Sequence, residues 1–229
     1  MDLKLEELSS LLNISEETVY DLIHKENIPH YKICSEYRFG IEEIENWILN
    51  NQEFLNGINQ KKEFLTSSSK EGFFKYSLFR AIYKGNFFCD LDISSKKEVF
   101  LFVCNYLSQH FPLDANVLFE LLLDREELMT TGLGHGFALP HTRDCYLNTN
   151  YDIVVAVRLK NPIEYHALDG LPVTNLFFLF SANNKSHLNL VNKIVVLNAN
   201  PNFHQDFEFL KEKKDLLSYV KNWEMGLKI

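Results

Sequence analysis

Apolar positions in the first fifty residues recur at the three- and four-residue spacing of short amphipathic helices. The spacing predicts three helices, with inward faces formed by Leu5, Leu8 and Leu12, by Val19, Leu22 and Ile23, and by Ile41, Ile44, Trp47 and Ile48. Ser15 is a natural N-cap for the second helix, because Glu16 and Glu17 follow it in the first turn, where acidic residues are favoured. Residues 26–33 and 36–40 alternate in polarity, and this pattern predicts two short strands around a turn.

The pattern changes twice after residue 50. Residues 51–75 are polar and contain a run of serines, so we interpret them as a linker with room for one helical turn. From residue 76 to 226 the pattern is α/β. Helices are predicted at 96–111, 115–128 and 185–199, the last with Leu188, Leu190, Val191 and Val195 inward. Continuous apolar runs at 151–159 and 173–180 are typical of buried strands, and residues 207–223 close the domain.

Composition narrows the classes of protein that fit. The 229 residues carry a formal net charge of −8, so we expect no general electrostatic attraction to nucleic acid or to an anionic membrane. No apolar run is long enough to span a membrane, and the acidic N-terminus does not resemble a signal peptide, so we expect a cytoplasmic protein. Cys34, Cys89, Cys104 and Cys145 show no CxxC spacing and are expected to be free thiols.

One short run, GLGHGFALPHTRD at residues 132–144, constrains the backbone around a histidine. Three alternating glycines permit close backbone approach, and Pro140 fixes φ just before His141. Such an imidazole can be a hydrogen-bonded structural residue, a metal ligand, a general base or a nucleophile. The chain has no HExxH or GxSxG motif, and His135, His141 and His187 have no acidic or thiol partner in register. We therefore expect no metal and no cofactor, and a histidine that itself takes up a group.

Residues 124–141, DREELMTTGLGHGFALPH, resemble the phosphorylation-site signature of phosphotransferase-system enzyme IIA domains of the fructose, mannitol and nitrogen-regulatory types. The residues that fit that signature are Arg125, Glu126, Thr131, Gly132, Gly134, Gly136, Ala138, Pro140 and His141. Two later segments agree in order: ALDGLPVTNLFFLFS at 167–181 is similar to the family's Asp-Gly-x-Pro-Val turn and strand, and NNKSHLNLVNKIVVL at 183–197 places His187 at the head of a helix. The resemblance covers residues 76–226 and implies the enzyme IIA fold, an α/β sheet flanked by helices.

The resemblance also implies roles. His141 would be the nucleophile and phosphoryl carrier, His187 would donate a hydrogen bond to phosphoryl oxygens, and Arg125 would give a charge-assisted contact. An anion cradle would be formed by Thr131, Gly132 and Gly134. This chain departs from the family pattern at His135, Arg143 and Asp144, so His135 could crowd or assist the phosphate and Arg143 adds positive charge nearby.

Residues 1–50 resemble the helix-turn-helix module of excisionase and MerR-type regulators, in which the second helix enters the major groove and the strand pair forms a wing. The module holds eleven acidic and four basic residues, a net charge of −7, which is the opposite of a nucleic-acid footprint. The DNA-binding candidates are Glu17, Tyr20, His24, Lys25, Lys32 and Arg38. Protein docking or dimerisation is the alternative role.

These observations predict a regulatory enzyme IIA-type protein that accepts a phosphoryl group on His141 from a histidine-phosphorylated carrier protein and signals that state. Two alternatives stay open: a DNA-binding transcriptional regulator with a sensing IIA-like domain, and a protein-docking switch that does not bind DNA. The expected partner is the phosphocarrier, and no membrane partner is expected. DNA and a second copy of the chain stay open as further partners.

Overall fold

The computed structural model describes residues 2–25, 28–52, 54–55, 57, 74–142 and 150–226. Residues 2–52, called the front module below, contain the helices α1 (Leu5–Leu12), α2 (Glu16–Lys25) and α3 (Ile41–Asn50). The strands β1 (Asp2–Lys4), β3 (Glu36–Gly40) and β2 (Tyr31–Ile33) pair antiparallel in that order. Ser15 caps α2 as the sequence predicts, since its hydroxyl accepts the Thr18 N–H at 3.1 Å.

Residues 77–226, called the main domain below, form a mixed sheet covered by helices. Its strands are β4 (Phe87–Leu91), β5 (Gly132–Gly134), β6 (Phe137–Ala138), β7 (Ile153–Ile163) and β8 (Val173–Phe180), arranged in the order β4-β7-β8-β6-β5. Its helices are α5 (Ser77–Lys84), α6 (Lys96–His110), α7 (Ala115–Leu128), α8 (Asn184–Asn198), α9 (Pro201–Phe209) and α10 (Lys213–Gly226). The predicted α/β architecture is confirmed.

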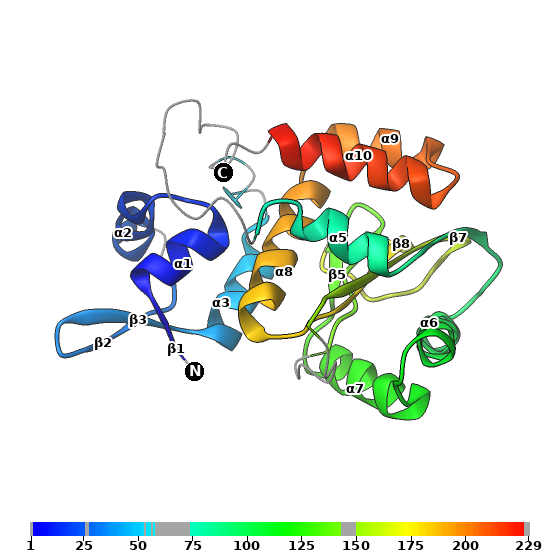
Figure 1. The fold of residues 1–229 in the computed structure, drawn as a ribbon, viewed down its shortest axis with the longest axis horizontal. Coiled ribbons are helices and arrows are strands. Elements are labelled where there is room, and N and C mark those ends of the chain that lie inside the picture. The colour runs from blue at the N-terminus through cyan, green and yellow to red at the C-terminus, as the bar shows by residue number, and fades with distance from the viewer. Residues whose placement is uncertain are drawn as a thin grey trace.

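The sheet is covered on both faces because β7 and β8 alternate two apolar sets. Ile153 and Val155 point into a core with α6 and α7, whereas Val154 and Ala156 point into a second core with α5 and α8. Figure 1 shows α6 and α7 on one side of the sheet and α5, α8, α9 and α10 on the other. This double burial explains why both strands read as continuous apolar runs.

The front module packs on the outer side of α8, and its apolar core is continuous with the core beneath that helix (Figure 1). Every residue of α8 from Ser186 to Asn198 is buried. The side-chain amides of Asn189 and Asn192 donate to the carbonyls of Leu11 and Leu12, each at 3.3 Å. These bonds satisfy carbonyls at the end of α1 that its own helix leaves free.

Several boundaries differ from the predicted ones. The first predicted strand is confined to Tyr31–Ile33, and β1, α5, β4, most of α9 and the short β5 and β6 were not predicted. The predicted closing segment 207–223 is divided between the end of α9 and α10. Within the predicted linker, residues 52, 54, 55 and 57 are helical, while residues 58–73 lie outside the described residues. None of the helices in the described ranges is long and apolar enough to cross a membrane.

Candidate active site

The glycine-rich run forms a tight hairpin that delivers His141 to the edge of β8. Gly134, His135 and Gly136 have φ values of +86°, +54° and +78°, and they reverse the chain between β5 and β6. After β6 the chain continues beside β8, where the Leu179 N–H donates to the Pro140 carbonyl at 2.9 Å. His141 is thereby fixed beside the sheet, and its side chain is fully buried.

A backbone contact fixes which nitrogen of His141 can react. Its Nδ1 lies 2.8 Å from the Leu139 carbonyl oxygen, which can only accept a hydrogen bond. Nδ1 must therefore carry a proton, and in the neutral ring Nε2 holds the free lone pair. The nucleophilic atom of this imidazole is thus Nε2, which points toward the other polar groups of the site.

Two further groups that the sequence predicts lie beside this nitrogen. Arg125, in the last turn of α7 and 2% exposed, donates from Nε to His141 Nε2 at 3.1 Å and from Nη1 to the Met129 carbonyl at 2.9 Å. His187 lies in the first turn of α8, with its ring centroid 5.2 Å from that of His141. Its Nδ1 is 3.4 Å from the Ser181 hydroxyl. The structure therefore brings Arg125, His141 and His187 together from three separate elements.

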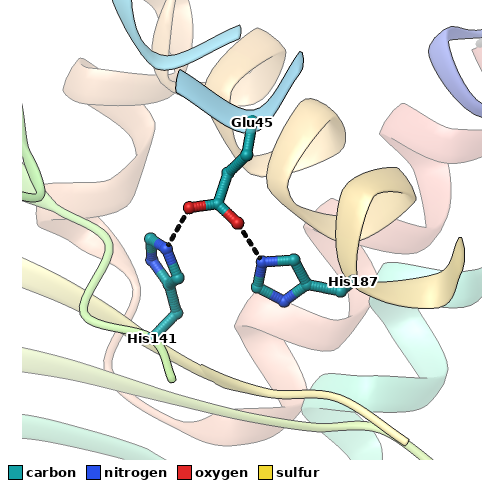
Figure 2. Close-up of side chains that lie close together, drawn as sticks. All are labelled: Glu45, His141 and His187. Atoms are coloured by element: carbon teal, nitrogen blue, oxygen red, sulfur yellow. Dashed lines mark hydrogen bonds and ion pairs between the residues drawn. The ribbon is translucent and has the colours of Figure 1, made fainter. Parts of the chain in front are cut away.

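The fourth member of the cluster is Glu45 of the front module, which sequence reasoning missed. Figure 2 shows its carboxylate entering between the two imidazole rings from α3. Oε1 lies 3.0 Å from His141 Nε2 and 3.1 Å from Arg125 Nη2, and Oε2 lies 2.8 Å from His187 Nε2. Glu45 is 4% exposed, so the cluster is closed to water.

A signal for Glu45 was present in the sequence. Ile41, Ile44 and Ile48 define the inward stripe of α3, and the complete i, i+3, i+4, i+7 pattern of such a stripe includes position 45. A charged residue on an inward stripe is almost always paired when it is buried. The partner could not be read from the sequence, because it lies 96 residues further along the chain.

The electrostatics of the cluster favour an ionised carboxylate. Burial disfavours the charged form of Glu45, but attraction to His141 and hydrogen bonds with His141 and His187 outweigh burial and hold the pKa of Glu45 well below its usual range. Burial lowers the pKa of His141, and the nearby Glu45 carboxylate offsets this only in part. The Arg125 guanidinium supplies the compensating positive charge.

Glu45, His141 and His187 also form a possible metal-ligand set, since one ligand atom from each lies within 4.8 Å of the others. The sequence-based reason for expecting no metal, the lack of an acidic partner in register, is therefore wrong. The position of Arg125 nevertheless opposes a cation here. Its N–H groups point at both His141 Nε2 and Glu45 Oε1, which are the atoms that would coordinate the ion.

The predicted cradle residues lie in the hairpin beside the site. The Thr131 hydroxyl is hydrogen bonded to the Glu126 carboxylate at 2.5 Å and to the Tyr165 hydroxyl at 2.8 Å, and its carbonyl accepts the Leu139 N–H. Burial and the Glu126 carboxylate raise the pKa of Tyr165 well above its usual value, so its hydroxyl stays protonated. This buried network fixes the strand that precedes His141.

The two cradle glycines lie close to the loop before β8. A Cβ on Gly132 would lie 2.6 Å from the Cα of Ala167, and one on Gly134 would lie 3.1 Å from an oxygen of Asp169. His135 is exposed at the tip of the hairpin, where its backbone N–H donates to Asp169 and its ring faces His204 at 5.1 Å. The departures noted at Arg143 and Asp144 lie outside the described residues.

The DNA-binding candidates all lie in the front module. Glu17, His24 and Lys25 are exposed on α2, and Tyr20 is 45% exposed. Tyr20 meets Tyr37 of β3 edge to face, and the Lys32 ammonium lies 4.5 Å from the centre of the same Tyr37 ring. This contact joins α2 to the strand pair. Arg38 is partly buried and pairs with Glu36 at 2.6 Å.

Both parts of the chain match known protein families. Residues 81–223 match the family described as the phosphoenolpyruvate-dependent sugar phosphotransferase system, EIIA 2, and residues 3–52 match a helix-turn-helix domain. The nitrogen regulatory protein of Pseudomonas aeruginosa is 37% identical over 106 residues, which cover 45% of this chain and 68% of that protein. That of Escherichia coli is 32% identical over 102 residues, which cover 44% of this chain and 62% of that protein. The matched segments thus span about two thirds of the length of these relatives.

Solved structures agree in fold. The nitrogen regulatory protein IIA-Ntr from Neisseria meningitidis superposes with a TM-score of 0.55 at 24% identity, over 60% of this chain and 94% of that one. A IIA domain from Streptococcus pyogenes gives a TM-score of 0.55 at 17% identity, over 66% of this chain and 97% of that one. Since the family match covers well over half of its length, the chain belongs to the EIIA 2 family of the phosphoenolpyruvate-dependent sugar phosphotransferase system, and a helix-turn-helix domain precedes the family domain.

Proposed function

We infer that this chain accepts a phosphoryl group on Nε2 of His141 from a histidine-phosphorylated carrier protein, and that the phosphorylated state serves regulation. The observation that carries this conclusion is the hydrogen bond from Nδ1 of His141 to the Leu139 carbonyl, which leaves Nε2 as the attacking atom beside Arg125. Membership in the EIIA 2 family and the similarity to nitrogen regulatory proteins support the same function.

The transfer needs little chemistry from the protein beyond positioning and charge stabilisation. The lone pair on His141 Nε2 attacks phosphorus, and the bond between phosphorus and the carrier's imidazole nitrogen breaks, with its electron pair returning to that imidazole. The Arg125 guanidinium compensates negative charge on the phosphoryl oxygens. His187, in the first turn of α8, donates from Nε2, and the N-terminus of that helix also favours an anion.

The test is incubation of the full chain with the phosphorylated carrier, followed by intact-mass measurement. Wild type is expected to gain one phosphoryl group, which acid removes and base preserves, as for a phosphoramidate. His141→Ala is expected to gain none. A phosphoryl adduct that persists in His141→Ala would assign the acceptor to another residue.

The front module is proposed to report the phosphorylation state. The exposed face of α2 carries Glu17, Tyr20, Asp21, His24 and Lys25, and Lys25 pairs with Asp21. Any DNA contact by this face would therefore rely on polar base contacts more than on phosphate neutralisation. Docking of the module on α8 favours protein contact as its first role. Retention of the full chain on a duplex, measured against salt concentration, separates a DNA-binding regulator from a docking switch.

A further inference from the structure

We propose that Glu45 is an internal occupant of the phosphoryl-binding site, so that docking of the front module and phosphorylation of His141 exclude each other. This inference rests on the proposed function, because it takes His141 as the phosphoryl acceptor. It adds a regulatory element within the chain itself. The acidic group belongs to the helix-turn-helix domain, and the groups that it contacts belong to the EIIA domain.

The contacts of Glu45 are those that an anionic phosphoryl group would need. Its two oxygens lie 3.0 Å and 2.8 Å from the Nε2 atoms of His141 and His187, and Arg125 Nη2 lies 3.1 Å from Oε1. A phosphorus atom bonded to His141 Nε2 would carry its oxygens into this same space (Figure 2). A carboxylate and a phosphoryl group therefore compete for one set of donors.

Docking also blocks Nε2 of His141 in either protonation state. In the neutral ring, the Nε2 lone pair faces Glu45 Oε1 at 3.0 Å, and that oxygen occupies the space that an incoming phosphorus atom would need. In the protonated ring, Nε2 carries a proton that it donates to Glu45 at 3.0 Å. In neither form is Nε2 open to phosphorus while the carboxylate is in place.

A carrier protein cannot reach the site in the docked arrangement. The exposed fractions of His141 and His187 are 0% and 4%, whereas transfer requires the donor's phosphorus to come within bonding distance of Nε2. The Glu45 carboxylate is itself buried and contacts His141, His187 and Arg125, and the burial of Ile44 and Ile48 fixes α3 over the site. Opening the site therefore requires α3 to move away from α8.

The phosphorylated state would hold the module away. A phosphoryl group carries up to two negative charges at neutral pH, and the Glu45 carboxylate would face it with water largely excluded. The outer side of α2, including Tyr20, is already exposed to solvent in the docked arrangement. Phosphorylation would therefore change where α2 is held relative to the main domain, and would uncover the α1 and α3 surfaces that contact α8.

The first experiment compares phosphorylation rates of full-length variants with a phosphorylated phosphocarrier as donor. Glu45→Ala is expected to take up phosphate about tenfold faster than wild type or more, and Glu45→Gln, which keeps the side-chain size and removes the charge, is expected to be intermediate. Glu43→Gln is the matched control, since Glu43 is exposed on the same helix. Circular dichroism confirms that each variant is folded. Equal rates for wild type and folded Glu45→Gln and Glu45→Ala would overturn the inference.

The second experiment follows the carboxylate itself by carbodiimide-driven labelling and peptide mass spectrometry near neutral pH. Glu45 is expected to be protected in the unphosphorylated chain and labelled after phosphorylation, while Glu43 is labelled in both states. In His141→Ala, exposure to the phosphorylated carrier should leave the labelling of Glu45 unchanged. Phosphate uptake by wild type with Glu45 still protected would refute mutual exclusion and leave the proposed function intact. Absence of phosphate from every variant would refute the proposed function and this inference with it.

Discussion

Replacing Arg125 by glutamine is expected to destabilise the folded chain by about 3 kcal/mol. The side chains of Arg125 and Glu45 are 1% and 5% exposed, so water cannot replace the lost partner. Removing one member of a buried ion pair costs about 3–5 kcal/mol. Because His141 and His187 still contact the carboxylate, we expect a value at the lower end of that range.

A double substitution measures the interaction between Arg125 and Glu45 separately from the contacts that each makes with other groups. In Arg125→Gln/Glu45→Gln both charges are gone, so no uncompensated charge stays buried, and the total loss should be smaller than the sum of the two single losses by about 2 kcal/mol. The exposed pair Lys160–Asp92, with side chains 61% and 73% exposed, is the control. Lys160→Gln should cost no more than about 1 kcal/mol.

Urea unfolding monitored by tryptophan fluorescence measures these losses. Trp47 lies on α3 two residues from Glu45 and is 7% exposed, and Trp223 lies on α10, so the combined emission reports on the docked module and on the main domain. The free energy of unfolding of each variant is compared with that of wild type. The comparison requires that the slope of this free energy against urea concentration is the same for both. A loss for Arg125→Gln as small as that for Lys160→Gln, or strictly additive single losses, would refute the view that Arg125 neutralises a buried Glu45.

Four further outcomes are expected. His187→Ala should still be phosphorylated, but about 30-fold to 1,000-fold more slowly, because one oriented hydrogen bond to developing charge contributes about 2–4 kcal/mol; labelling at the wild-type rate would remove His187 from the site. Burial raises the pKa of Cys104 to about 12, whereas Cys34 is exposed, so iodoacetamide at pH 8 should modify Cys34 and leave Cys104 intact until urea unfolds the chain. Gly132→Ala should lower the free energy of unfolding by about 1–3 kcal/mol, since its Cβ would meet Ala167; an unchanged urea midpoint would mean that the hairpin yields without cost. Random duplex DNA should not retain the full chain near physiological salt, and any binding should weaken with a log–log salt slope of only about −3, for three phosphate contacts; tight and steeply salt-dependent retention would favour the transcription-factor role.

Much of the fold follows from local sequence signals. The Ser15 cap sets the start of α2, and the continuous apolar runs at 151–159 and 173–180 correspond to β7 and β8. The short strands β1, β5 and β6 carry no such signal, because two or three residues are too few to show a period. These segments are strands because they pair with neighbouring strands, and the tertiary fold determines which strands lie beside them.

The candidate site, like the fold, could be predicted from the sequence only in part. The resemblance to enzyme IIA domains pointed to Arg125, His141 and His187, and these three side chains do meet, although their roles in phosphoryl transfer stay predictions. Glu45 could not be placed with them, because an EIIA pattern says nothing about a residue in another domain. In the sequence it is one of eleven acidic residues in the front module. Its position on the inward stripe of α3 indicates burial, but only the packing of α3 on α8 shows which groups it meets.

The burial of α8 on all sides limits how far the front module can be exchanged between proteins. Asn189 and Asn192 complete the end of α1, and Lys185 pairs with Glu7 at 2.6 Å, so the helix carries a matching surface for this particular partner. A different EIIA domain joined to residues 2–52 would lack these contacts unless the same positions on its helix were changed with it. In engineering terms the transferable unit is therefore the front module together with the outer face of α8. The boundary of that unit runs along a helix surface instead of through a linker.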